Sequence, residues 1–134
     1  HSETIPSPYV ATRPFRVNAG ALHAYLLVPG GATKYLSDLR SGDAVMIVNS
    51  RGETQQAYVG RCKVERRPLL LVCAEADGRE IGLVMQNAET ARLTKPDESA
   101  LSVAVAKPGD EVLAHITEGG RHFGMKVKET LTER

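Results

Sequence analysis

Short apolar runs separated by turn-forming residues recur along the chain, and a helical repeat is almost absent. Runs rich in Val, Leu, Ile and Tyr lie at residues 21–28, 44–48, 54–65, 68–76, 80–86, 91–94, 101–105 and 111–116. Gly, Pro, Asn and Asp bound these runs, which is typical of strands joined by tight turns. The pattern predicts a mainly β domain, barrel-like, of many short strands with one or two short helices.

Local signals refine this prediction. The turn "DGR" joins residues 68–76 to residues 80–86 as a hairpin, and Gly60 is a candidate bulge in the long strand predicted at residues 54–65. The two expected helices are residues 34–39, "KYLSDL", and residues 126–131, "KVKETL".

A Gly-Asp-x-Val motif occurs twice, at residues 42–45 and at residues 109–112. Glycine permits the positive φ of a tight turn, and aspartate can hydrogen-bond the turn backbone. We expect both motifs to be turns that lead into strands. Two related β-units are the alternative interpretation, for which the motif is too short to be evidence.

Composition and charge narrow the class of protein. The 134 residues are 42% hydrophobic and 25% charged, with a net charge of +1, which is the profile of one soluble domain. This balance favours neither nucleic acid nor a membrane surface as partner, and no apolar run approaches the ~18 residues of a membrane span. Cys62 and Cys73 lie in strand-like surroundings, so we expect buried free thiols in a reducing cytoplasm.

Three clusters carry polar groups suited to chemistry. In "RPFRVNAGALHAY", Arg13 and Arg16 can bind a carboxylate or phosphate, and Asn18 and His23 add polar groups. The alternative is a strand edge with surface arginines and a structural histidine.

The second cluster is "MQNAETARL", in which Gln86, Asn87, Glu89 and Thr90 interrupt an apolar strand, as turn formers or as ligand contacts. Turn formation is favoured there. The third is "RHFGM", where Arg121 and His122 precede Phe123 and Met125. Histidine transfers protons near neutral pH, although a lone histidine is more often structural.

Taken in order, these clusters resemble a known family. The segments "RPFRVNAGALHAY", "TKYLSDLRSGD", "VGRCKVERRPLLLV", "QNAETARL", "KPGDEVL" and "RHFGMKVKETLTER" are similar to the C-terminal part of the archaeal-type (type II) 3-dehydroquinate synthases. Members of that family are longer, and they carry an N-terminal portion. The resemblance therefore implies that residues 1–24 end a preceding catalytic domain or form an interdomain strand, and that residues 25–134 form the C-terminal β domain. A processed or recombinant start at His1 is the alternative.

The resemblance implies a cytoplasmic enzyme of aromatic biosynthesis. The dehydroquinate branch converts an amino-heptulosonate to 3-dehydroquinate by NAD-dependent oxidative deamination and cyclisation. The other branch makes 3-amino-4-hydroxybenzoate from a phosphorylated amino-ulosonate with manganese and no NAD. A third alternative is a non-catalytic lid or dimerisation domain, which the lack of a dinucleotide-binding fingerprint favours. A homo-oligomer is one open possibility for the assembly.

An anionic, polyhydroxylated substrate needs cations, amides and a proton-transfer group. On this hypothesis the arginines at positions 13, 16 and 121 bind substrate anions, and Asn18 and Asn87 contact its hydroxyls. His23 or His122 transfers a proton, and Glu89 acts as a base or binds a divalent metal. The metal ligands are not predicted.

Overall fold

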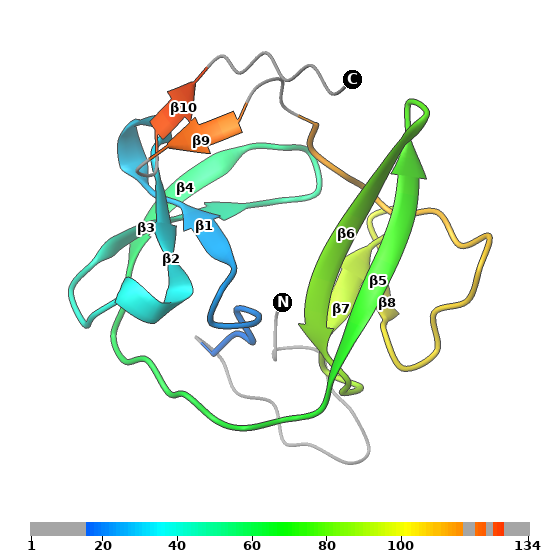
Figure 1. Cartoon of the computed structure of the whole chain (residues 1–134), viewed down its shortest axis with the longest axis horizontal. Helices are drawn as coiled ribbons and strands as arrows, with labels where there is room; N and C mark the ends of the chain where they lie inside the picture. The colour runs from blue at the N-terminus through cyan, green and yellow to red at the C-terminus, as the bar shows by residue number, and fades with distance from the viewer. Residues whose placement is uncertain (1–15, 117–119, 123–124, 128–134) are drawn as a thin grey trace, which may run out of the picture. The chain divides into compact units, whose positions relative to one another are not determined.

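In the computed structural model, residues 16–116, 120–122 and 125–127 are described, and side chains are described only up to residue 116. The chain is mainly β, as predicted (Figure 1). Its strands are β1 (Tyr25–Leu27), β2 (Thr33–Tyr35), β3 (Ala44–Val48), β4 (Thr54–Tyr58), β5 (Leu69–Ala76), β6 (Arg79–Gln86), β7 (Arg92–Thr94), β8 (Ala100–Ser102), β9 (Gly120–His122) and β10 (Met125–Val127). Two 3₁₀ turns, η1 (Pro29–Gly31) and η2 (Leu36–Asp38), are the helical elements among the described residues.

The strands pair antiparallel with their sequence neighbours into five two-stranded sheets. Each pair is a local hairpin, and no sheet of the described residues extends to a third strand, so they show no closed barrel. Among these residues there is also no helix that is long and apolar enough to cross a membrane.

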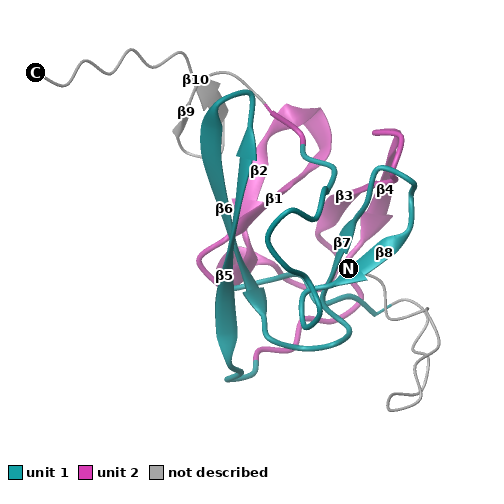
Figure 2. Ribbon diagram, turned by 90° about the vertical axis from the view of Figure 1, so that its right-hand side faces the viewer, with its two compact units in different colours: residues 1–21, 65–114 teal, residues 22–64, 115–134 magenta. Residues whose placement is uncertain are grey.

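The chain divides into two compact units, drawn in different colours in Figure 2. Unit 1 contains residues 1–21 and 65–114, and unit 2 contains residues 22–64 and 115–134. The two units are defined by contacts within the folded chain, and they do not test the predicted domain boundary after residue 24. That boundary stays a prediction.

Unit 1 is built on the β5–β6 hairpin. Asp77 and Gly78 both have positive φ, 51° and 71°, which is the two-residue turn that matches the twist of a hairpin. Alternate residues of β5 point to opposite faces, and one face packs on a small core. That core consists of Met85, Ala91 and Val103, with Leu70, Val72 and Leu93 packed against it.

Unit 2 contains the β1–β2 and β3–β4 hairpins and the β9–β10 pair. Tyr25 and Tyr35 lie opposite each other on β1 and β2, and their rings meet edge to face with centroids 6.5 Å apart. Such aromatic cross-strand pairs stabilise short hairpins. The β3–β4 register runs from Ala44 opposite Tyr58 to Val48 opposite Thr54.

The Gly-Asp motif forms the same turn in both units. In residues 40–43 the Asp43 N–H donates to the Arg40 carbonyl, and the Arg40 N–H donates to the Asp43 carboxylate. Residues 107–110 repeat both bonds between Asp110 and Lys107. The glycine at the third position of each turn has φ near +90°, as predicted for this motif.

Only the first of these turns leads into a strand, which is β3. The strand predicted at residues 111–116 is absent. In this segment the Leu113 N–H donates to the Thr94 carbonyl of β7. One such bond makes no ladder. The repeated Gly-Asp-x-Val motif therefore corresponds to a shared turn, and the described residues show no second copy of a β-unit.

Other predicted bounds were also too generous. The strand predicted at residues 54–65 ends at Tyr58, which lies opposite Ala44, the first residue of β3. The segment before β3 turns away at residues 40–43, so no described strand lies opposite the residues after Tyr58. Gly60 therefore follows the strand and is no bulge within it. The run at residues 101–105 turns after Ser102, and only residues 25–27 of the run at 21–28 form a strand.

The two predicted helices had different outcomes in the structure. Within the helix predicted at residues 34–39 only Leu36–Asp38 is a 3₁₀ turn. In the helix predicted at residues 126–131, Lys126 and Val127 belong to strand β10, and the remaining residues lie outside the described part.

Candidate functional site

The structure joins two of the predicted polar clusters within unit 1. The Asn18 Nδ2 group donates a hydrogen bond to Gln86 Oε1 at 2.5 Å. The Asn18 Oδ1 atom accepts a bond from the Gly20 N–H at 3.2 Å, where Gly20 has a φ of 117°. These bonds fix the segment before β1 to the last residue of β6. One N–H of the Asn18 amide is not used by these two bonds.

The loop after β6 carries the next two predicted residues. The Asn87 N–H donates to the Pro68 carbonyl at 2.9 Å, and the Ala88 N–H donates to the Gln86 carbonyl at 2.9 Å. Buried Ala91 closes the loop through a bond from its N–H to the Ala88 carbonyl. The turn-forming interpretation of this cluster is therefore confirmed. The side chains of Asn87 and Glu89 are exposed, and they are accessible to a ligand.

The remaining predicted residues lie elsewhere. Arg16 is half-buried, two positions before Asn18. His23 is exposed and belongs to unit 2. The backbone of Arg121 and His122 lies in β9, while their side chains, Arg13 and the predicted anchor Phe123 are outside the described part. All the assigned site roles stay predictions.

Gln86 belongs to the second polar cluster, but the sequence analysis gives it no site role. It is the half-buried partner of Asn18, and its signal in the sequence is a polar residue at the end of an apolar strand. The polar strip formed by Asn18, Gln86 and Asn87 offers amide donors and acceptors, which suit hydroxyl and carbonyl groups of a small ligand. We call these three residues the amide strip.

The prediction that Cys62 and Cys73 are buried was wrong. Both are free thiols, and both are exposed. Cys73 occupies an outward position in the alternating strand β5, and Cys62 lies in residues 60–68, which form no strand. An apolar neighbourhood in the sequence therefore did not decide which face each cysteine occupies.

Among the described residues, the carboxyl groups of Asp43 and Asp97 have shifted pKa values, and both belong to turns. The Lys34 ammonium, which donates to Asp43 Oδ2 at 2.6 Å, and the Arg40 N–H lower the pKa of Asp43 below its usual value. The hydroxyl and the backbone N–H of Ser99 lower the pKa of Asp97 in the same way. Both groups stabilise loops, and neither is a predicted site residue.

The described residues do not by themselves fit either implied cofactor. No three His, Cys, Asp or Glu side chains among them converge as a metal site would require. These residues also contain no α-helix whose N-terminus could bind a pyrophosphate, as dinucleotide-binding folds do.

Comparison with known proteins identifies the family. The model described as "3-dehydroquinate synthase II C-terminal domain" matches residues 1–134. The chain belongs to the 3-dehydroquinate synthase II family. This confirms the resemblance carried by the six sequence segments.

Several relatives are similar over the whole chain. A protein of Methanospirillum hungatei JF-1 named "3-dehydroquinate synthase" is 58% identical over 134 residues, which are 100% of this chain and 41% of the relative. A protein of Methanopyrus kandleri with the same name is 57% identical over 137 residues, 100% of this chain and 34% of the relative. A "3-dehydroquinate synthase homolog" of Aquifex aeolicus is 54% identical over 134 residues, 100% of this chain and 40% of the relative.

The chain thus spans between about one third and two fifths of the length of these curated relatives. No solved structure matches it.

Proposed function

We propose that this chain is the C-terminal portion of an enzyme that converts an amino-heptulosonate to 3-dehydroquinate by NAD-dependent oxidative deamination and cyclisation. The observation that carries the proposal is the 57–58% identity, across the whole chain, to relatives named 3-dehydroquinate synthase. Because the chain covers only part of those relatives, the proposal concerns the complete enzyme. Most of the groups that bind NAD then belong to the portion that precedes this chain in the relatives.

Within this chain, the amide strip is proposed to contact the substrate. A polyhydroxylated carbon chain needs donors and acceptors held in fixed positions, and the bond between Asn18 and Gln86 orients both carboxamides. Exposed Asn87 follows directly and adds a third carboxamide. Arg16, two residues before Asn18, supplies positive charge for the substrate carboxylate.

Proton transfer is proposed for His23 or His122, with Glu89 as a base or a metal ligand. A pH–rate profile of the full-length His122→Ala variant tests this role, because loss of a proton-transfer group removes one limb of the profile. A profile of unchanged shape would assign His122 a structural role.

Product analysis of the full-length protein tests the function itself. The unphosphorylated amino-heptulosonate and the phosphorylated amino-ulosonate are supplied with and without NAD, and with and without manganese. We expect 3-dehydroquinate only from the unphosphorylated compound with NAD. Formation of 3-amino-4-hydroxybenzoate from the phosphorylated compound with manganese would place the protein in the other branch, and the absence of both products would contradict the catalytic proposal.

Substitution of Arg16 tests its role in binding. Arg16→Ala should raise KM for the substrate at least tenfold with a smaller change in kcat, because the lost ion pair acts in the ground state as well. The matched control is Arg66→Ala, which removes an exposed arginine of residues 60–68. Equal KM values for Arg16→Ala and the unmodified enzyme would remove the anion-binding role.

A further inference from the structure

The β5–β6 hairpin has a second face, directed away from the core of unit 1. On β5 this face contains Leu69, Leu71, Cys73 and Glu75, and the residues directly opposite on β6 are Gln86, Val84, Gly82 and Glu80. We call these eight residues the outer hairpin face.

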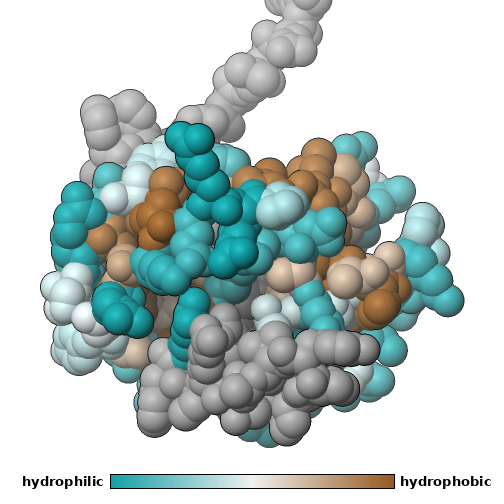
Figure 3. All heavy atoms as spheres, turned by 90° about the horizontal axis from the view of Figure 1, so that it is seen from below, coloured by the Kyte–Doolittle hydropathy of each residue, from teal (hydrophilic) through white to brown (hydrophobic). Residues whose placement is uncertain are grey.

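The outer hairpin face is apolar and uncovered along half its length. Leu69 is 51% exposed and Leu71 is 62% exposed. Leu71 Cδ1 lies 3.4 Å from the place that a Gly82 Cβ would occupy, so the leucine side chain extends across the hairpin towards Gly82. Figure 3 shows apolar surface, in brown, between hydrophilic side chains on one face of the molecule. Exposed apolar side chains that gather on one face mark contact sites.

A hairpin with apolar side chains on both faces needs a cover on each. Its inner face, which includes Met85, is covered by the core residues Ala91 and Val103. A two-stranded hairpin by itself is only marginally stable in water. An outer face exposed to water would therefore leave unit 1 with little stability. The remaining question is which part of the protein supplies the cover.

The position of Asn18 indicates which part of the protein covers the outer hairpin face. Gln86, which binds Asn18, lies directly opposite Leu69 at the apolar end of the outer hairpin face. This hydrogen bond holds Asn18 at that end of the hairpin. The matching family model is that of a C-terminal domain, and the relatives are more than twice as long as this chain.

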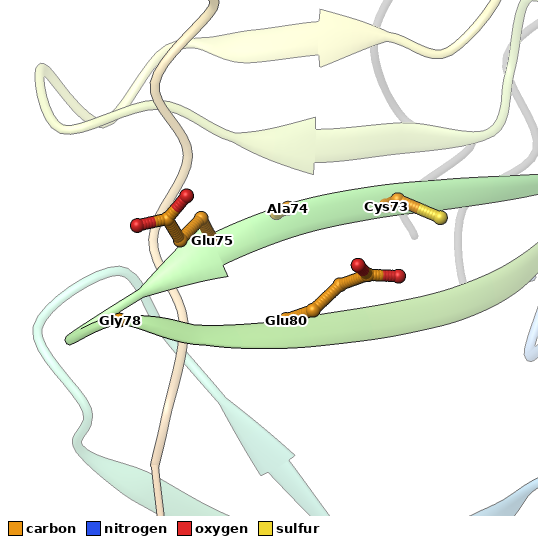
Figure 4. Close-up of a pocket in the computed structure, with 5 residues that line it drawn as sticks. All are labelled: Cys73, Ala74, Glu75, Gly78 and Glu80. Atoms are coloured by element: carbon orange, nitrogen blue, oxygen red, sulfur yellow. The ribbon is translucent and has the colours of Figure 1, made fainter.

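We propose that the outer hairpin face is the docking surface for the N-terminal portion of the full-length polypeptide. The surface that docks there presents apolar side chains to Leu69, Leu71 and Val84. It also presents a basic side chain near the hairpin tip, where Glu75 and Glu80 lie opposite each other beside an open depression (Figure 4). Like charges at directly opposite positions of two strands are destabilising, and a basic side chain beside them offsets that cost.

The two cysteines provide an internal test in the full-length protein. Cys73 lies within the proposed interface, while Cys62 lies outside it, and both are exposed in this chain. The native full-length protein is treated with iodoacetamide, and labelling of each cysteine is followed by peptide mass spectrometry against the urea-unfolded protein. We expect Cys73 to be protected about tenfold more than Cys62. Equal labelling of the two native cysteines would overturn the proposal.

Dilution separates this proposal from contact with a second copy of the chain. A contact within one polypeptide keeps its protection of Cys73 on hundredfold dilution, whereas a contact between copies loses it. Protection that falls on dilution would therefore also overturn the proposal.

A pair of variants adds a second measurement. Leu71→Asp should raise labelling of Cys73 at least fivefold, because a carboxylate in an apolar interface opens it. Val64→Asp, which changes a residue 66% exposed outside the outer hairpin face, should leave that labelling unchanged. Should Leu71→Asp fail to fold, the comparison of the two native cysteines still decides.

Discussion

Asn18 and Gln86 are 68 positions apart in the sequence, and their side-chain amides are hydrogen-bonded. The bond connects the segment before β1 to the end of β6, within unit 1. It therefore unites residues that the sequence placed in two separate polar clusters. The same bond orients both amides of the proposed substrate contact and holds Asn18 beside Gln86 of the outer hairpin face.

Removing either partner should destabilise the protein. Asn18→Ala and Gln86→Ala should each lower the free energy of unfolding, and the double variant should cost less than their sum by about 1 kcal/mol. Urea denaturation of the full-length protein measures this coupling. Asn87→Ala is the control, because the Asn87 contact with Pro68 uses its backbone N–H. Strictly additive effects of the first two substitutions would contradict the bond.

The carboxylate of Asp43 should make the free energy of unfolding depend on pH in the acidic range. Its hydrogen bonds from Lys34 and the Arg40 N–H hold its pKa in the folded state below the usual 3.8. The stabilisation is therefore present above about pH 3.8 and is lost as the pH falls through the lowered pKa of the folded state.

Asp43→Asn should remove this part of the pH dependence, which thermal unfolding in buffers below pH 5 would show. Lys34→Met should raise the pKa of Asp43, because it removes the largest cause of the shift. The change is measurable by NMR titration of the carboxyl carbon. An Asp43 titration that is identical with and without Lys34 would contradict the ion pair.

The two Gly-Asp turns should respond alike to alanine. Gly42 and Gly109 have φ of 90° and 95°, so Gly42→Ala and Gly109→Ala should each lower the free energy of unfolding by roughly 1–2 kcal/mol. The added methyl group meets nothing within 4 Å at either position, so backbone strain is the whole cause. Gly60→Ala is the control, because that glycine has open space and no positive φ. A loss at Gly60 equal to that at Gly42 would contradict the explanation.

Two hairpin loops have the same backbone hydrogen bonds but carry different residues at the position of positive φ. In residues 49–53 and in residues 95–99, the first N–H donates to the last carbonyl and the fourth N–H donates to the first carbonyl. The fourth residue has a positive φ in both loops, and it is Gly52 in one and Glu98 in the other.

Glu98→Gly should therefore raise the melting temperature, through a stabilisation of about 1 kcal/mol in the left-handed region. The reciprocal change Gly52→Glu should lower it. Differential scanning calorimetry measures both shifts. A lower melting temperature for Glu98→Gly would mean that the Glu98 side chain contributes more than the backbone strain costs.

Local signals in the sequence were enough for part of the fold. Residues 44–48 form β3 as predicted, and the hairpin at residues 68–86 closes at the predicted turn. Both Gly-Asp turns also formed, although only the first leads into a strand. In each case the information lies within a few neighbouring residues, in the alternation of side chains and in the φ that glycine permits. The family was likewise evident from the ordered motifs.

The tertiary structure alone decided which strands find partners and which side chains become exposed. The run at residues 111–116 has strand composition but no neighbour to complete a ladder, and Cys73 faces outward because the core lies on the other side of β5. The contact of Asn18 with Gln86 likewise required the chain to return after 68 positions. Pairing, facing and long-range contact depend on residues that are distant in the sequence, so a local pattern cannot determine them.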